Sequence, residues 1–301
     1  MSELESVYQY LTSIENWKTR TDDSNVRIST ILKNIKSDAV ARNDQQIAKS
    51  SWCLEQILEI QGKYLTAFSQ LKSEKYYDGW CTLERIEIEL DSLQRHFETD
   101  DKDLYKLCFI QKHGKQLQSL FPYKLFISPA YLHLEKKCTI CGQPILIRHP
   151  CGHILGEIYD GEQCLHEITK FRVLEVSVVP NPVQKYSVLF VKNSESEEKS
   201  DHYDYSSLRY LLKGLREPFD AWDMFWTKKR HPHSLFSHVD KDDKCPCDSG
   251  KTYRKCCLKT SGVLRPHVEF LFHVPPPEDL PKILYPQIAN TEKDASSPTQ
   301  K

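Results

Sequence analysis

The chain has 301 residues, of which 39% are hydrophobic and 28% charged, and its formal net charge at pH 7 is -1. That length supports two or three domains, and a charge near zero excludes a whole-molecule attraction to nucleic acid or anionic lipid. No apolar run approaches the roughly 18 residues that span a bilayer, and the acidic start has no secretory-signal pattern. We therefore expect a cytoplasmic protein without a membrane span.

Residues 1–125 are predicted to form a helical bundle or hairpin domain. Apolar side chains recur at three- and four-residue steps from Leu54 to Leu71, and the pattern repeats after the break at "SEKYYDG". This is the period of a helix with one apolar side, so the two stripes predict an antiparallel hairpin. A further helix is expected near residues 104–121.

Residues 126–200 are predicted to form a β-rich zinc-knuckle module. Four segments, "LFISPAYLHL", "PILIRH", "FRVLEVSVV" and "KYSVLFV", are rich in β-branched and aromatic residues, and turn residues separate them. The polar stretch "KNSESEEKSDHYD" that follows is expected to be a loop.

The remainder of the chain is predicted to contain three parts. A helical connector at residues 201–243 includes a helix over 206–229, which Pro218 interrupts. A zinc motif occupies residues 244–260, and residues 261–301 supply one strand, a proline-rich strap and a disordered tail. The predicted fold class is α+β, with a helical N-terminal domain, a central zinc-containing β module and a small C-terminal zinc knot.

Eleven cysteines are many for a chain expected in a reducing cytoplasm. Disulfides do not persist there, so metal binding is the leading explanation. Cys53, Cys81 and Cys108 lie singly among apolar neighbours and are predicted to be small buried hydrophobes. The other eight cysteines fall into two clusters.

The C-terminal cluster reads "CPCDSGKTYRKCC" at residues 245–257. Four thiolates on so short a loop suit tetrahedral Zn²⁺, which takes sulfur ligands at about 2.3 Å. Pro246 fixes the backbone between two ligands, and Gly250 permits a tight reversal. Such a peptide has almost no core, so the metal would supply its folding free energy. The predicted ligands are Cys245, Cys247, Cys256 and Cys257, with Lys251, Arg254 and Lys255 offsetting the thiolate charge.

This stretch resembles the SEC-C motif, the small zinc-binding module named for the C-terminus of the SecA preprotein translocase. It has the Cys-Pro-Cys start, the Ser-Gly-Lys turn, an aromatic and basic centre and a paired cysteine end, with Asp248 where glycine is commoner. The resemblance implies a bound zinc and an accessory contact with a chaperone, ribosome or acidic phospholipid. The motif also occurs alone in many bacterial proteins, and the chain has no phosphate-binding loop like that of the translocase motor.

The central cluster begins with Cys138 and Cys141, whose spacing is that of a zinc-knuckle turn. Two further ligands must come from Cys151, His153, Cys164 and His166, because a tetrahedral zinc takes four. We favour Cys164 as one of them and either Cys151 or His153 as the other. The cysteine or histidine that does not bind the zinc would instead contact one of the ligands and hold its orientation. The sequence thus predicts two Zn²⁺ ions per chain.

Neither cluster has the pattern of a catalytic metal site. Catalytic zinc usually keeps three protein ligands, an open position and a carboxylate base. Glu157 and Glu162 lie near the central cluster, but cysteine-rich ligation is typical of closed structural sites, and no H-E-x-x-H run is present. We predict no catalytic residues and no enzyme activity.

The predicted function is that of a zinc-binding adaptor that docks to a protein or ribosomal partner through the C-terminal motif. Lys251, Arg254 and Lys255 would contact the partner, within a flank at residues 226–265 that has ten Lys/Arg against four Asp. One alternative, which the same basic flank supports, is a nucleic-acid-binding zinc protein. Its setting would be a phage response or a mobile element, because "GHILGEIYDGEQC" and the strand after it are similar to segments of tailed-phage structural and prohead-maturation proteins. The other is a metal-dependent hydrolase whose site the sequence does not reveal.

Overall fold

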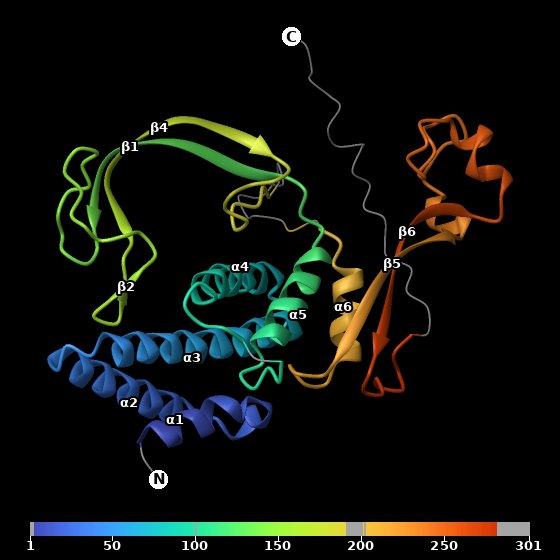
Figure 1. Ribbon diagram of the computed structural model, residues 1–301. Helices are drawn as coiled ribbons and strands as arrows, with labels where there is room; N and C mark the ends of the chain where they lie inside the picture. Colours follow the sequence, from blue (N-terminus) through green and yellow to red (C-terminus); the bar gives the residue numbers. More distant parts are fainter. Residues whose placement is uncertain (1–2, 100, 191–200, 202, 282–301) are drawn as a thin grey trace. The chain divides into compact units, whose positions relative to one another are not determined.

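The computed structural model describes residues 3–99, 101–190, 201 and 203–281 (Figure 1). The chain divides into two compact units, one formed by Met1–Gln118 with Tyr123–Leu189 and the other by Ser119–Pro122 with Phe190–Lys301. The first is mainly helical with a long β ribbon, and the second holds a short helix, a second ribbon and the C-terminal cysteines. The fold is α+β, as predicted. Among the helices of the described part, none has the length and apolarity needed to cross a membrane.

The helices of the first unit form around the predicted hairpin. Its two arms, α3 (Gln45–Lys72) and α4 (Tyr76–Leu93), are antiparallel neighbours, and their apolar stripes are buried against each other. Thr21 and Asp44 start α2 and α3 by accepting backbone N–H groups of the first turn, as helix-capping side chains do. The other elements are α1 (Glu3–Thr12), η1 (Ile14–Thr19), α2 (Asp22–Ala41) and α5 (Leu107–Ser119).

The long ribbon of the first unit pairs β1 (Phe126–Cys138) with β4 (His166–Val179) in antiparallel register. The loop between them contains the short strands β2 (Ile158–Tyr159) and β3 (Glu162–Gln163). Two predicted strands are wrong, because "PILIRH" and "KYSVLFV" each supply only an isolated bridge to β1. Ile147 of the first segment is fully exposed, so that apolar run has no face to bury.

The segment "KYSVLFV" instead docks on α4 through its backbone. The indole N–H of Trp80 donates to the carbonyl of Lys185 at 2.6 Å, and the Tyr77 hydroxyl donates to the carbonyl of Tyr186 at 2.6 Å. The buried Glu84 carboxylate accepts the backbone N–H of Lys185. Burial raises the pKa of Glu84, while these accepted backbone hydrogen bonds act in the opposite direction.

Glu84→Ala is expected to cost about 1–3 kcal/mol in the free energy of unfolding, because the backbone N–H of Lys185 loses its acceptor. Glu84→Gln keeps an acceptor oxygen and should cost less. Since the folded-state pKa of Glu84 is raised above its unfolded-state value, ionising Glu84 lowers the stability of the unsubstituted chain as the pH rises between those two pKa values, so the cost of Glu84→Gln should be smaller above that range than below it. Urea unfolding at several pH values measures this. Equal losses for Ala and Gln would show that the hydrogen bond contributes nothing.

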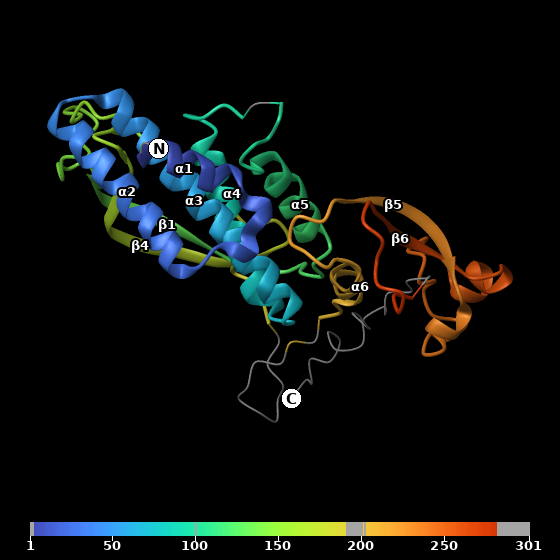
Figure 2. The ribbon, with the colours of Figure 1, turned by 90° about the horizontal axis from the view of Figure 1, so that it is seen from below.

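The second unit contains α6 (Ser206–Gly214), β5 (Trp222–His231) and β6 (Val263–Phe272), which pair as an antiparallel ribbon. In Figure 2 this ribbon runs from α6 toward the loops, drawn in orange, that carry the C-terminal cysteines. Those loops include η2 (His233–Phe236), η3 (Tyr253–Lys255) and η4 (Cys257–Lys259).

The predicted helix over 206–229 is wrong beyond Gly214. The chain leaves the helix at Leu215 in an extended conformation, ahead of Pro218, and a Cβ on Gly214 would lie only 2.3 Å from the ring of Phe272. The strand β6 therefore crosses where the helix ends, and Trp222–His231 pairs with it. The predicted strand in "HVEFLFHV" is confirmed within β6. The predicted tail and most of the predicted loop at 192–204 lie outside the described residues.

Candidate metal centres

The C-terminal centre is shaped by a tight loop at the far end of β5 and β6. Lys244 forms a bridge with Thr252, and the backbone N–H of Cys245 donates to the carbonyl of Lys251 at 2.7 Å. Gly250, at the tip, has φ of +73°, a left-handed conformation that favours glycine. This reversal brings the two cysteines of the first half back toward the cysteine pair of the second.

The four predicted sulfur ligands meet in space. The Sγ atoms of Cys245, Cys247, Cys256 and Cys257 all lie within 4.8 Å of one another. The distance from Cys256 to Cys247 is 3.5 Å and to Cys257 3.9 Å. A tetrahedron with Zn–S bonds of 2.3 Å has edges of about 3.8 Å, so these distances fit four thiolates around one zinc ion.

A small core, here the knot core, surrounds these sulfurs. It consists of Phe236, Tyr253 and Val263 with Cys245 and Cys257. His233 fastens it, because its Nε2 lies 2.8 Å from the carbonyl of Thr260 and must donate. The other nitrogen, Nδ1, then accepts the Tyr253 hydroxyl at 2.6 Å. His233 and Phe236 were not predicted from the sequence, since they stand outside the cysteine motif.

Burial and hydrogen bonds displace the pKa values of the thiols at this centre. Burial raises the pKa of Cys245 to about 12. Burial acts the same way on Cys247, but hydrogen bonds from Ser249 and neighbouring cysteines outweigh it and lower its pKa to about 6. Thiolates at such short distances repel one another, so a divalent cation is what would keep all four ionised together.

The basic side chains predicted to contact a partner lie on the outside of the knot. Lys251, Arg254 and Lys255 are all exposed. Arg254 is paired with Asp242 at 2.8 Å, whereas neither lysine has an ion pair within the described residues. Arg265 of β6 reaches back to Asp248 at 2.7 Å and also donates to the carbonyl of Pro246. Their role in partner binding stays a prediction.

The central centre begins where β1 ends. The backbone N–H of Gly142 donates to the carbonyl of Cys138 at 2.8 Å, and that of Cys138 donates to the carbonyl of Gln143 at 2.9 Å. These bonds close the predicted knuckle turn. Cys164 follows β3, where its N–H donates to the carbonyl of Glu157 at 2.8 Å and its carbonyl accepts the N–H of Gly156 at 2.8 Å.

Five predicted donors come together at this centre. Those of Cys138, Cys141, Cys151 and His153 lie within 4.8 Å of one another, and the Sγ of Cys164 lies 3.7 Å from that of Cys138. Cys164 is fully buried, and the Nδ1 atom of His153 is buried with no hydrogen-bond partner in the described part of the chain. Five donors exceed the four that zinc takes, so the choice among them stays a prediction.

The central centre, like the knot, has one cysteine with a lowered pKa and one with a raised pKa. Hydrogen bonds from the backbone N–H groups of Cys141 and Ile140 lower the pKa of Cys138 to about 6, although burial acts against them. Burial and the neighbouring sulfurs of Cys138, Cys151 and Cys141 raise the pKa of Cys164 to about 11. In space, the Sγ of Cys164 lies beside that of Cys138, next to the group formed by Cys138, Cys141, Cys151 and His153.

Contacts that the sequence did not indicate hold the central centre on the helices. Lys36 of α2 bridges Glu55 at 2.7 Å and Glu162 at 2.9 Å, and His96 lies with its Nε2 2.7 Å from the carbonyl of Gly156. Gly161 passes so close that a Cβ there would be 2.4 Å from the Lys36 side chain. These residues are polar and far apart in the chain, so no local pattern points to them.

Of the three single cysteines, only Cys53 is fully buried, and Cys81 is half-buried. The prediction of a buried side chain is wrong for Cys108, which is exposed. Leu107 and Ile110 occupy the buried side of α5, and the intervening Cys108 faces away from it.

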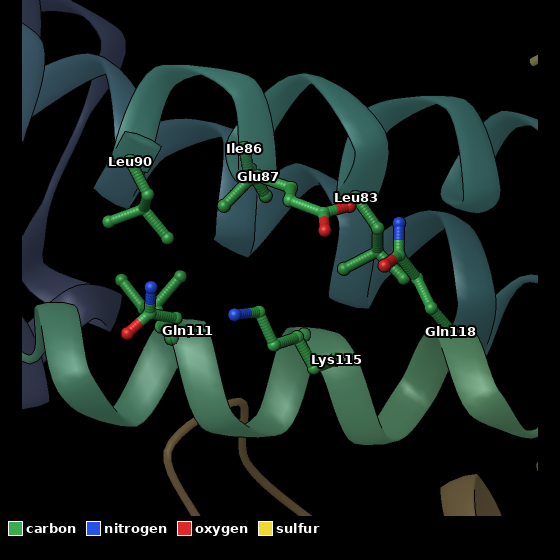
Figure 3. A pocket seen from close by; sticks show the side chains of 9 residues that line it. Leu83, Ile86, Glu87, Leu90, Gln111, Lys115 and Gln118 are labelled. Atoms are coloured by element: carbon green, nitrogen blue, oxygen red, sulfur yellow. The ribbon is translucent and has the colours of Figure 1, made fainter. Parts of the chain in front are cut away.

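A small cavity separates α4 from α5 (Figure 3). Leu83 and Leu90 line it from one helix, and Gln111, Lys115 and Gln118 from the other. Its volume of about 10 Å³ is the size of a single water site, too small for a substrate.

The two cysteine centres define a metal-binding protein. The family model of the SEC-C motif matches residues 243–259, which contain the whole C-terminal ligand set. The predicted resemblance is thereby confirmed for that segment. No curated protein and no solved structure is significantly similar to the chain.

Proposed function

We propose that the chain is a non-enzymatic zinc adaptor of a reducing cytoplasm, and that its C-terminal knot docks to a protein or ribosomal partner. The observation that carries this proposal is the division of the knot into an inside and an outside. The Cys245 and Cys257 side chains are buried in the knot core, while Lys251 and Lys255 are exposed on the loop that the sulfurs order. A zinc ion would hold these two cations in fixed positions for a partner.

The donor sets support a structural role for the metal. The knot offers four thiols and the central centre at least four donors, so a zinc ion at either would have a closed coordination sphere. Zinc would then contribute folding free energy and hold the loops in place. Glu162, one of the carboxylates considered as a catalytic base, is paired with Lys36 instead. These features favour the adaptor over the hydrolase alternative.

The proposal is tested by the retention of two probes on immobilised protein: purified bacterial ribosomes, and a ribosome-depleted cytosolic extract. Lys251→Gln with Lys255→Gln should weaken retention about tenfold, since two exposed cations are lost. Arg27→Gln with Lys33→Gln, an equal charge change on exposed positions of α2, should leave it unchanged. Cys256→Ser should abolish it without unfolding residues 1–125. If Cys256→Ser retains both probes as well as the unsubstituted chain does, the adaptor proposal is wrong.

A further inference from the structure

The β5–β6 ribbon has a basic surface with an exposed tryptophan that neither metal centre explains. Side chains alternate across a strand, so Trp226, Lys228 and Arg230 of β5 share one face. The register places Val268, Pro266 and Leu264 of β6 directly opposite them. We call the exposed part of this surface the Trp226 face: Trp226, Lys228, Arg230, Leu264 and Pro266.

The Trp226 face is left uncovered because the knot and α6 pack on other parts of the ribbon. On the opposite face, Val263 belongs to the knot core and Arg265 binds Asp248, so the knot packs there. On the side of the ribbon that carries Trp226, α6 covers the end farther from the knot, where Tyr210 stacks on Phe270. Trp226 remains 56% exposed between these two contacts. Trp226 shares its face with the exposed Leu264 and Pro266, and exposed apolar surface that is contiguous in this way indicates an interaction site.

The charges on the Trp226 face are of one sign. It has no acidic residue, and Lys228 has no ion pair within the described residues. Arg230 is held in place, donating to the Thr260 hydroxyl at 2.7 Å and to the carbonyl of Gly262 at 3.0 Å. On the opposite face, by contrast, Lys229 is neutralised by Glu269 at 2.6 Å. The Trp226 face therefore suits an anionic partner that also offers a flat apolar group.

The residues around the Trp226 face add to its positive charge. Ten Lys/Arg against four Asp at residues 226–265 give a charge of +6, which four thiolates and one Zn²⁺ would reduce to +4. Neighbouring side chains on one face of a strand are separated by about 6.6 Å, a step that successive phosphates of an extended single strand can follow. Single-strand-binding proteins combine such a basic track with aromatic side chains on which bases stack.

We propose that the Trp226 face binds single-stranded nucleic acid, with a base stacked on Trp226 and phosphates on Lys228 and Arg230. A duplex is a poor ligand, because its bases are already stacked on one another. The interaction goes beyond the docking proposed for the knot, since it uses neither Lys251 nor Lys255.

The test is fluorescence anisotropy with labelled oligouridine and oligothymidine, the zinc-loaded full chain being titrated at several salt concentrations. Trp226→Ala should weaken binding about tenfold with an unchanged salt dependence. Lys228→Gln should weaken it and reduce the slope of log Kd against log salt by about 0.7, the value for one lost phosphate contact on a single strand. Preference for oligouridine would assign RNA, and preference for oligothymidine DNA. Either result supports the proposal.

The chain offers matched controls on the opposite face of the same strand. Phe225 is 54% exposed, nearly as much as Trp226, and Lys229 adjoins Lys228. Phe225→Ala and Lys229→Gln should therefore leave binding within about twofold of the unsubstituted chain. Equal losses from Phe225→Ala and Trp226→Ala would overturn the proposal, as would a hairpin duplex binding as tightly as the single strands. Displacement by an equal concentration of polyglutamate would also overturn it and indicate an acidic protein partner.

Discussion

Cys257→Ser is expected to remove one of two zinc ions from each chain and to unfold the knot while α1–α5 stay folded. Two of the five residues of the knot core, Cys245 and Cys257, are themselves metal ligands in this proposal. Without the ion, Phe236, Tyr253 and Val263 are too few to order the loop. Structural zinc in comparably small peptides contributes about 10–16 kcal/mol of binding free energy, which is far more than such a core supplies.

Elemental zinc analysis of the reduced protein measures the first effect and hydrogen exchange the second. Exchange should accelerate at Tyr253 and Arg254, whose backbone N–H groups donate to the carbonyls of Asp243 and Lys241 at 2.8 Å each. It should not change along α3 and α4. Cys108→Ser is the matched control, because Cys108 is exposed and outside both clusters. Two zinc ions in Cys257→Ser with unchanged exchange would show that the cluster is not a metal site.

The features that the sequence predicts correctly are those with a local origin. The α3–α4 hairpin follows from an apolar stripe whose period is complete within each helix. The C-terminal cluster is equally local, because its four sulfurs lie on one loop whose reversal depends on Gly250 and the residues beside it. In both cases the residues that make contact are close together in the chain, so their spacing largely determines the structure.

The features that the sequence does not predict depend on partners far along the chain. Strand β5 pairs with β6 across the whole cysteine loop, and its helical apolar spacing gives no hint of that partner. The segment "KYSVLFV" binds α4 through backbone groups rather than through its apolar pattern. The attachment of Glu162 and Gly156 to Lys36 and His96 likewise joins polar residues that no periodicity marks.

The two metal centres also differ in how far their ligands can be predicted from local sequence. The knot has four donors and needs no choice, whereas the central centre gathers five from β1, a long loop and the residue after β3. Its ligand set is decided by how that loop folds on the helices. The loss of a central ligand should therefore be felt in the helical unit, while the loss of a knot ligand should not.

We expect Cys164→Ser to remove the central zinc and His153→Ala to retain it, a result that would assign Cys138, Cys141, Cys151 and Cys164 as the ligands. The Cys138–Cys164 distance of 3.7 Å matches the edge of about 3.8 Å expected for a zinc–sulfur tetrahedron. Cys164 also bonds through its backbone to Gly156, whose carbonyl lies 2.7 Å from His96. Loss of zinc at Cys164 should thus weaken the contact of the loop with His96, which follows α4, and speed hydrogen exchange at residues 156–164.

Cobalt substitution distinguishes the two ligand sets directly, because the charge-transfer absorption of cobalt increases with the number of thiolate ligands. His153→Ala should leave this absorption and the zinc content unchanged, whereas Cys164→Ser should lower both. The opposite result would place His153 on the metal and leave Cys164 as a buried thiol beside it. That outcome would also explain the buried Nδ1 atom of His153, which has no hydrogen-bond partner among the described residues. The pair of variants therefore decides between the two donors, since a tetrahedral ion that already holds Cys138, Cys141 and Cys151 has room for one more.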